Sequence, residues 1–369
     1  MENGIYFEML LFVYSLTILI GIVGNIINIF VFRTKSMYKI PTSRLLYFLS
    51  ISDLLLLSLC ATDPIMTFMF NYQIRLESTS FCKIHVFLTY FLSHLSSIIL
   101  MIVCIERSLL IQNIRLNIFQ IQSISKTISV IAFLIGLING HFLFLFSLSS
   151  EKLELNSNYS INISLFLNEL KLNLSFEGLK PAVLCYSTDM TLYSYFLNNI
   201  WNWIDTSIYS IIPFIIMIIS SILILIQIRK NDRNFKGKST TIGMKQKKRN
   251  NKIALMLITT NFSFILFSLL YDIISNNMME SNSILILTAH LLAYSNNSFN
   301  FVFYALFSSQ YKSILCGMFK TDEIEDLANQ YHMVKLNSKL NSRNDLKSKS
   351  DFLKNYEKII SEFNYIDEE

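Results

Sequence analysis

The sequence predicts an all-α membrane protein, a seven-transmembrane helix bundle followed by a short amphipathic eighth helix. Three observations predict this fold: charged residues are scarce, apolar residues gather in seven long stretches, and basic residues alternate between successive connections. Of the 369 residues, 52% are hydrophobic and 15% are charged, whereas a soluble globular chain carries about 25% charged residues. The seven stretches are Met9–Phe32, Leu45–Thr62, Ile84–Ile105, Thr127–Ser150, Thr206–Ile228, Ile253–Tyr271 and Ser281–Tyr311.

Each stretch is long enough to form a membrane-spanning helix. A helix needs about 20 apolar residues to cross the hydrocarbon core of a bilayer. Lipid admits only structures that satisfy their own backbone hydrogen bonds, and the short alternating segments of a β-barrel do not occur in this sequence. Residues 1–8 contain two acids and no Lys or Arg, which is unlike a secretory signal, so we interpret the first stretch as a retained span.

Basic residues predict the orientation of the bundle. The connections after the first, third and fifth stretches carry 17 Lys and Arg residues, whereas the N-terminal segment and the other connections carry 5. Because Lys and Arg collect on the cytoplasmic side of short loops, the N-terminus is predicted to lie outside the cell. The chain is therefore expected to cross the plasma membrane seven times, with residues 1–8 as an extracellular N-terminus and residues 9–311 as the bundle.

Glycosylation sequons agree with this orientation. Three N-x-S sequons, at Asn158, Asn162 and Asn173, lie between the fourth and fifth stretches. Such sites are glycosylated only in lumenal or extracellular loops, which is where the charge pattern places this connection. Chance is the alternative explanation, because Asn and Ser are common in this chain.

The five cysteines divide by position. Cys60 and Cys104 lie within apolar stretches and are expected to be small core residues. Cys82 lies at the outer start of the third span and Cys185 lies late in the long outer loop, so both are predicted in an oxidising compartment, where a disulfide between them would tie the loop to the bundle. Cys316 follows the seventh stretch and is a candidate for palmitoylation.

Polar residues inside the apolar stretches are candidates for function, because they are costly in lipid. They form short groups: Gly24-Asn25 in the first stretch, Leu49–Asp53 in the second, Cys82 and Glu106–Ser108 at the two ends of the third, Pro213 in the fifth, and Asn296–Tyr304 in the seventh. Cys82 and Arg107 are separated by 25 positions.

This ordered set resembles the rhodopsin-like class of G-protein-coupled receptors. That family carries Gly-Asn in helix 1, Leu-x-x-x-Asp in helix 2, Cys and then Asp/Glu-Arg-Tyr in helix 3, Pro in helix 5 and Asn-Pro-x-x-Tyr in helix 7. The resemblance runs from about Ile5 to Phe319. It implies a receptor, not an enzyme, that lies in the lipid bilayer, binds an extracellular peptide or small molecule, and activates a heterotrimeric G protein. No nucleic-acid partner is expected.

The resemblance implies a sodium pocket at the centre of the bundle, formed by Asp53, Ser96, Asn296 and Asn300. A hard cation prefers oxygen ligands, and a carboxylate, a hydroxyl and two amides supply them. No other cofactor is expected. A carboxylate in mid-span needs a cation, a proton or hydrogen-bond donors. The alternative is therefore a protonated Asp53 that hydrogen-bonds to Asn25 and Asn300.

The resemblance also implies an activation switch that comprises Glu106, Arg107, Asn300 and Tyr304. In the resting receptor the acid would hold the adjacent guanidinium, and its release would open the cleft that receives the G protein. The alternative for Arg107 is an interfacial side chain that extends to lipid headgroups.

Several family features are missing. The family's Cys-Trp-x-Pro motif of helix 6 is absent from Thr260–Tyr271, and Phe301 stands in place of the helix-7 proline. Phe133 lies near the position of a helix-4 Trp, and Ser221 replaces a helix-5 Tyr. The chain is thus a divergent relative, and a seven-helix protein that has lost signalling stays an alternative function.

The ligand is the least determined feature of the sequence. Thr89 stands at the position of the helix-3 Asp of amine receptors, and Tyr294 stands at the position of the helix-7 Lys of light-sensing members, so neither ligand class is supported. Acids near the outer helix ends, at Asp63, Asp205 and Asp272, would favour a cationic group if they converge on one cavity. Water-facing acids at helix ends are the alternative for each.

A long outer loop favours a peptide ligand. In peptide-binding members a loop such as that from about Glu151 to Ile200 often forms a hairpin, so the resemblance suggests a neuropeptide-type ligand with a basic residue. We interpret Trp201 and Trp203 as interfacial belt residues in preference to pocket aromatics.

The cytoplasmic face is predicted from charge and helical spacing. The connection Arg229–Lys252 is strongly basic, which suits both anionic lipid and a G protein. Residues 312–320 are predicted to form an amphipathic helix on the membrane surface. The polar tail 321–369 is predicted to be mobile, and phosphorylation of its serines would recruit an arrestin-like partner.

A transporter is the other alternative function. Transporters commonly show internal repeats and paired broken helices. Neither is visible in this sequence, and the receptor pattern accounts for the polar residues within the spans.

Overall fold

The computed structural model describes residues 2–70, 72–112, 114, 116, 119–151, 182–187, 192–235, 255, 258–268, 270–271, 274 and 283–318. Residues 1–312 form one compact unit and residues 313–369 a second. The predicted glycosylation sites Asn158, Asn162 and Asn173, the acid Asp272 and the cytoplasmic tail 321–369 lie outside the described residues.

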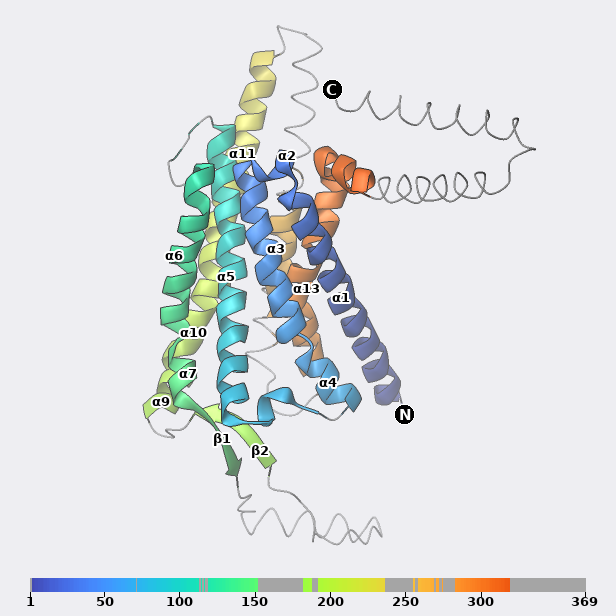
Figure 1. The fold of residues 1–369 in the computed structure, drawn as a ribbon, viewed down its shortest axis with the longest axis vertical. Coiled ribbons are helices and arrows are strands. Elements are labelled where there is room, and N and C mark those ends of the chain that lie inside the picture. The colour runs from blue at the N-terminus through green and yellow to red at the C-terminus, as the bar shows by residue number, and fades with distance from the viewer. Residues whose placement is uncertain are drawn as a thin grey trace, which may run out of the picture. The chain divides into compact units, whose positions relative to one another are not determined.

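Long helices dominate the first unit (Figure 1). They are α1 (Glu2–Arg33), α3 (Pro41–Leu59), α5 (Thr79–Ile111), α6 (Ile121–Asn139), α11 (Ile212–Phe235) and α13 (Ser283–Phe307). Shorter elements are α2 (Lys35–Tyr38), α4 (Asp63–Phe70), η1 (Ile74–Leu76), α7 (His141–Leu145), α9 (Leu192–Tyr195), η3 (Phe196–Trp201), α10 (Asn202–Thr206) and η4 (Ser207–Ile211).

Five helical segments of the described chain are long and apolar enough to cross a membrane. They are Ile5–Arg33, Pro41–Phe70, Thr79–Ile111, Ser123–Leu145 and Asn199–Lys230, and they match the first five predicted spans. The sixth predicted span is helical over Ile258–Ser268, and the seventh forms α13. The first helix begins at Glu2, before the predicted start of the span at Met9.

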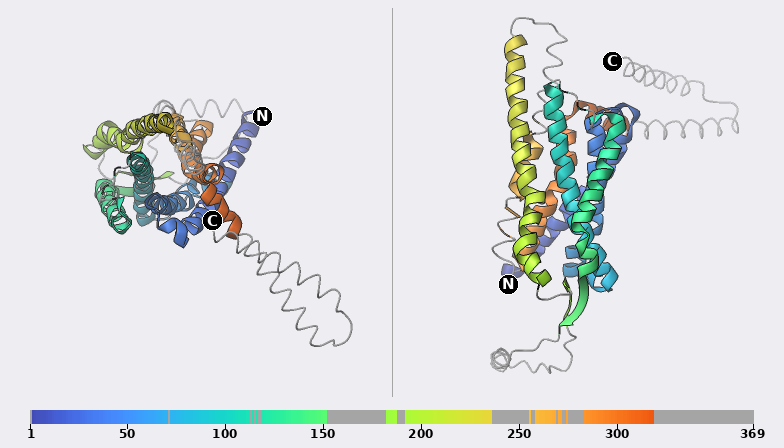
Figure 2. Two further views of the ribbon diagram at one scale, coloured as in Figure 1. Left: turned by 90° about the horizontal axis from the view of Figure 1, so that it is seen from above. Right: turned by 90° about the vertical axis from the view of Figure 1, so that its left-hand side faces the viewer.

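Helix α5 lies inside the bundle and contacts α3, α6 and α11 (Figure 2). Helix α1 packs on α3 and α13. Buried apolar side chains of α1, α3, α5 and α13 form a core near one end of these helices: Leu11, Tyr14, Ile18, Leu56, Leu57, Leu92, Leu287 and Tyr294. The functional residues are therefore held by helices that share one packed interior.

Glycines allow α1 to approach α13 closely. A Cβ atom at Gly24 would clash with the Phe301 ring, and one at Gly21 would lie 2.5 Å from the Ser298 hydroxyl. Real Cβ atoms do not tolerate such distances. The glycine in the Gly24-Asn25 motif therefore has a packing role.

The fourth predicted span is shorter than its apolar stretch. We predicted a helix to Ser150, but the helix ends at Leu145 and the chain continues as strand β1 (Phe146–Glu151). This strand pairs antiparallel with β2 (Ala182–Ser187), and Leu148 stands opposite Cys185. Apolar length alone could not separate the last helical turn from the strand, because both contain Phe and Leu.

The seventh predicted span also ends early. Helix α13 ends at Phe307, and a new helical stretch covers residues 309–318. At the break, the Ser308 hydroxyl accepts a hydrogen bond from the Tyr311 amide. Residues 313–318, which belong to the second unit, are helical in the region where the eighth helix was predicted.

Candidate functional site

Asp53 of α3 is the centre of a buried polar cluster. Its side chain is 0% exposed. Asn297 of α13 donates its amide to Asp53 Oδ1 at 2.7 Å, and Asn300 donates to Oδ2 at 2.9 Å. Asn297 and Asn300 lie three positions apart, which places them on one face of the helix. Donors from α13 therefore compensate both carboxylate oxygens, as a buried charge requires.

The structure brings together three of the four predicted sodium-pocket residues. Ser96 of α5 interacts with the same carboxylate and donates to the Ser52 hydroxyl at 2.9 Å. Asn296 is buried, but no hydrogen bond among the described residues joins it to Asp53. Asn297 takes that place, and the sequence signal for it was its three-residue spacing from Asn300.

Two buried amide oxygens near this cluster have no hydrogen-bond partner within the described part of the chain: Asn25 Oδ1 and Asn300 Oδ1. The Asn25 amide nitrogen donates to Gly21 O at 2.9 Å and to Asn297 O at 3.0 Å. A hydrogen bond between Asp53 and Asn25 is not among these contacts, whereas Asn300 does hydrogen-bond to Asp53, with Asn300 as the donor. Unpartnered oxygens beside a carboxylate are the donor set that a hard cation prefers, so these residues fit such an ion.

Glu106 and Arg107 form a second site, at the far end of α5. Glu106 is 4% exposed, and its Oε2 lies 3.8 Å from Arg107 Nε. Thr42, in the first turn of α3, donates its hydroxyl to the same oxygen. The carboxylate therefore joins α3 to α5. Thr42 was missed by the sequence analysis, because it lies 64 positions away and belongs to no motif.

The other predicted switch residue, Tyr304, lies close to Arg107. Both line a cavity of about 60 Å³ together with Phe32 and Tyr311. The Tyr304 hydroxyl is buried and has no hydrogen-bond partner among the residues that the structure describes. Tyr311 donates its hydroxyl to Asn28 Oδ1 at 2.7 Å, which ties the start of the next helical stretch to α1.

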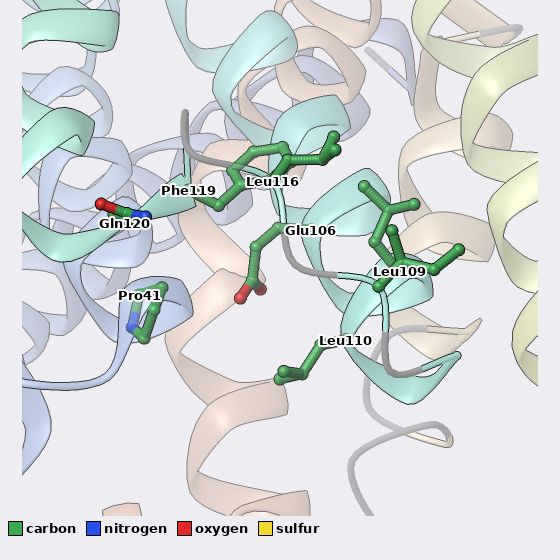
Figure 3. Close-up of a pocket in the computed structure, with 8 residues that line it drawn as sticks. Pro41, Glu106, Leu109, Leu110, Leu116, Phe119 and Gln120 are labelled. Atoms are coloured by element: carbon green, nitrogen blue, oxygen red, sulfur yellow. The ribbon is translucent and has the colours of Figure 1, made fainter.

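A larger cavity, of about 390 Å³, lies on the other side of Glu106 (Figure 3). Its walls are the start of α3, the last turn of α5 and the connection that follows α5. No motif predicted it, because its apolar lining has no fixed spacing in the sequence.

The candidate ligand acids lie in two separate environments. Asp63 of α4 has Oδ2 3.6 Å from Arg75 Nε, and its Oδ1 is buried without a partner in the described chain. Asp205 of α10 lies 2.8 Å from His94 Nε2. The two acids therefore each have a cationic or hydrogen-bonding partner from this chain.

His94 connects three helices. Asn139 of α6 donates its amide to His94 Nδ1 at 3.1 Å. Because an acceptor at Nδ1 leaves the hydrogen on Nε2, the neutral ring donates from Nε2 to Asp205. His94 is 0% exposed, so this triad ties α5 to α6 and α10 inside the bundle.

Of the remaining ligand candidates, Thr89 is partly buried and Tyr294 is buried. Thr89 donates its hydroxyl to His85 O, one turn earlier in α5. Tyr294 is 7% exposed, and its ring stacks on His290 at a centroid distance of 6.1 Å.

The belt interpretation stays a prediction for Trp203 and is wrong for Trp201. Trp203 is 71% exposed. Trp201 is 4% exposed, and its ring lies 4.3 Å from His141 and 5.3 Å from Phe142, between centroids. That part of the prediction was wrong because the rings of α7, distant in sequence, pack on Trp201.

Tyr193 closes this aromatic cluster. Its hydroxyl lies 2.6 Å from His141 Nδ1. Burial raises the pKa of the Tyr193 phenol to about 12, so the phenol stays protonated. Its hydroxyl therefore donates a hydrogen bond to His141 Nδ1.

The predicted disulfide is present. Cys82, in the first turn of α5, is bonded to Cys185 of β2. It ties the hairpin to the start of α5. Among the described residues Cys60, Cys104 and Cys316 are free, and the first two are buried as predicted, whereas Cys316 is exposed.

The comparisons agree with this geometry. The model of the 7 transmembrane receptor (rhodopsin family) matches residues 24–304 of the chain. A search of curated proteins finds no match. The match covers most of the chain, including the Asp53 cluster, Glu106, Arg107 and Tyr304. The chain therefore belongs to the rhodopsin family of seven-transmembrane receptors.

This membership confirms the fold and the general class of function. The chain is an all-α, seven-transmembrane, multi-pass membrane protein and a receptor of the G-protein-coupled class. The short hairpin of β1 and β2 is an addition to the helical bundle that composition did not predict.

Proposed function

We propose that this receptor binds an extracellular ligand and responds by activating a heterotrimeric G protein. The observation that carries the proposal is the buried Glu106 carboxylate, which holds Arg107 3.8 Å away and accepts a hydrogen bond from Thr42. Glu106 thus contacts both its neighbour Arg107 and Thr42 of α3. Such a carboxylate is suited to hold Arg107 in the resting state of the receptor.

The disulfide supports an orientation with the N-terminus outside. Cys82 and Arg107 are separated by 25 positions of one helix, which corresponds to about 38 Å along its axis at about 1.5 Å per residue. That length exceeds the roughly 30 Å hydrocarbon core, so the two residues face opposite sides of the membrane. Disulfides persist in oxidising compartments, which supports an outside position for the Cys82 end and a cytoplasmic position for Arg107.

The mechanism is a shift between two packings of the bundle. Release of Arg107 from Glu106 would free the cytoplasmic ends of α3 and α5 and let a G protein bind. Tyr304 supports this assignment, because it lines a small cavity with Arg107 and has a buried hydroxyl that is ready for a new partner.

The Asp53 cluster is proposed to hold sodium in the resting packing. Asp53, Ser96 and Asn300 would bind the ion, and Asn296 remains the fourth predicted donor. A bound sodium ion would neutralise Asp53. The side chains would then link α3, α5 and α13 through a shared centre.

Sodium binding can be tested without a ligand. An ion that binds the folded state alone raises its stability in proportion to the logarithm of its concentration. The melting temperature of the purified receptor should rise when sodium replaces potassium, and Asp53→Asn should abolish the rise. An equal rise in that variant would exclude the site.

The proposed ligand is a peptide with a basic residue. Asp63 supports it, because its buried Oδ1 has no partner in the described chain and Arg75 shows that a guanidinium reaches the other oxygen. The hairpin of β1 and β2 is the element expected for peptide-binding members. A peptide library screened on cells should return basic peptides, and a set of hits restricted to neutral lipids or anionic metabolites would exclude this ligand class.

The G-protein proposal is tested through basal signalling. Glu106→Gln removes the charge that holds Arg107, so we expect a rise in ligand-independent nucleotide exchange on G proteins in membranes. Arg107→Ala should abolish exchange. Glu77→Gln, an exposed acid outside both sites, is the matched control and should behave as the wild type. If all three variants match the wild type at equal surface expression, the proposed switch is wrong.

A further inference from the structure

The cavity beside Glu106 has the size of a ligand site. Its volume of about 390 Å³ falls within the range of about 300–1,000 Å³ that small-molecule sites occupy. Figure 3 shows the Glu106 carboxylate in the middle of the lining side chains. The cavity lies at the end of the bundle that carries Arg107, away from the disulfide and the candidate ligand acids.

The lining combines an apolar wall with a single acid. Apart from Glu106 and Gln120, the residues that line the cavity are apolar: Pro41, Leu109, Leu110, Ile114, Leu116 and Phe119. Three of them have apolar surface that the described protein does not cover, since Leu110, Ile114 and Leu116 are 39%, 45% and 43% exposed. A ligand with an apolar body would cover this surface, which is favourable in water.

We propose that this cavity binds a small molecule with an apolar body and one ammonium group, and that the ammonium competes with Arg107 for Glu106. The proposal rests on the proposed function for its orientation, which makes the site cytoplasmic, and for its effect on signalling. It adds a second binding site to the receptor.

The charge of the ligand follows from Glu106. A buried carboxylate is costly unless it has charged or hydrogen-bonding partners. Its contact to Arg107 Nε, at 3.8 Å, is longer than the roughly 2.7–2.9 Å of a direct charge-assisted hydrogen bond. Arg107 Nε is thus too far from Glu106 for such a hydrogen bond. An ammonium group that enters from the cavity would make one. An anionic ligand would be repelled, and a neutral one would gain only the apolar contacts.

The effect on the receptor follows from the same competition. Glu106 Oε2 accepts from Thr42 and faces Arg107, so one carboxylate serves the lock and the cavity wall. A cation that engages this carboxylate weakens its hold on Arg107. Because a ligand shifts an equilibrium toward the state that it binds better, occupancy should favour the packing with Arg107 released.

Binding is measured by protection of an introduced thiol. Leu110→Cys places a thiol in the cavity wall, in a Cys316→Ser background that removes the exposed native cysteine. The rate of its modification by propyl methanethiosulfonate is measured on purified receptor with 4-phenylbutylamine or with the neutral 4-phenylbutan-1-ol. Leu225→Cys is the matched control, because Leu225 of α11 is also 39% exposed and does not line the cavity.

The expected result is selective protection by the amine. The amine should slow modification of Leu110→Cys and leave the modification rate of Leu225→Cys unchanged. Its affinity should be about tenfold higher than that of the alcohol, because one charged hydrogen bond contributes about that much. Glu106→Gln should remove this difference. Equal protection by both compounds, equal slowing at Leu225→Cys, or no protection would each overturn the proposal.

Coupling between the cavity and the Glu106–Arg107 contact is measured with groups attached covalently to the thiol of Leu110→Cys. An aminoethyl adduct on Leu110→Cys should raise nucleotide exchange, whereas a propyl adduct of the same length should not. If Glu106→Gln raises exchange and the aminoethyl adduct does not, the cavity is not coupled to Arg107. If Glu106→Gln itself leaves exchange unchanged, the proposed function fails, and the thiol protection alone decides whether the cation site exists.

Discussion

The side chain of Asn297, and not that of Asn296, donates to Asp53 Oδ1 at 2.7 Å. The register of α13 thus decides which of two adjacent amides compensates the buried acid. Asn300, one turn further on, compensates the other oxygen. Of the two adjacent residues, Asn297 therefore stabilises the Asp53 carboxylate and Asn296 has a different role.

Replacement of these two residues should separate those roles. Asn297→Ala removes a hydrogen bond to a buried carboxylate, and we expect the free energy of unfolding to fall by about 1.5–3 kcal/mol. Asn296→Ala should lower it by less. The melting temperature of purified receptor measures both, and equal losses would contradict the register described for α13.

Asn261 links three helices where the family's helix-6 motif is missing. Its Oδ1 accepts from the Cys104 thiol at 3.0 Å, and its Nδ2 donates to the Ser221 hydroxyl at 2.8 Å. Asn261→Leu should lower the free energy of unfolding by about 1–3 kcal/mol, because it leaves buried polar groups unpaired. In the Ser221→Ala background the loss should be smaller. Additive losses in a thermal-melt cycle would show that the hydrogen bond contributes nothing.

Gly24 should not tolerate a methyl group. Gly24→Ala places a Cβ in steric conflict with the Phe301 ring, so α1 and α13 must separate. We expect a loss of about 1–3 kcal/mol, as in other overpacked cores, and a lower yield of folded receptor. Gly136→Ala is the control, because its Cβ would meet only Phe91 at 3.8 Å. If both alanines have equal effects on yield and melting temperature, the close approach of α1 and α13 is wrong.

Asp205 should behave as a structural partner of His94. Asp205→Asn keeps an oxygen that accepts from His94 Nε2, so its melting temperature should stay near that of the wild type. Asp205→Ala leaves the buried imidazole without that acceptor and should cost about 1–3 kcal/mol. A role limited to ligand binding predicts the opposite pattern, with normal stability in both variants and lost ligand binding in both.

Contacts within one helix were the most predictable from sequence. Glu106 and Arg107 are adjacent, and Asn297 and Asn300 differ by three positions, so local geometry restricts where they point. The spans were predictable for a similar reason, because apolar length follows from the thickness of lipid. The disulfide of Cys82 and Cys185 followed from the compartment that the loop charges assign.

Contacts between distant helices were not predictable in the same way. The hydrogen bond from Thr42 to Glu106 depends on how the first turn of α3 meets the last turns of α5. The burial of Trp201 depends on α7, whose end no apolar pattern defines. The triad of Asn139, His94 and Asp205 requires three helices in register, and one sequence has no signal for that register.

The polar face of α13 also bears on how the protein is made. Five of its residues, Ser295, Asn296, Asn297, Ser298 and Asn300, are buried against other helices. Asn and Ser in mid-span oppose entry into lipid when a helix is alone. Helix α13 is synthesised after α1 and α3, the helices that it packs on. The last span should thus enter the membrane as a partner of helices already in place, and the receptor should be most vulnerable to cellular quality control in the interval before they meet.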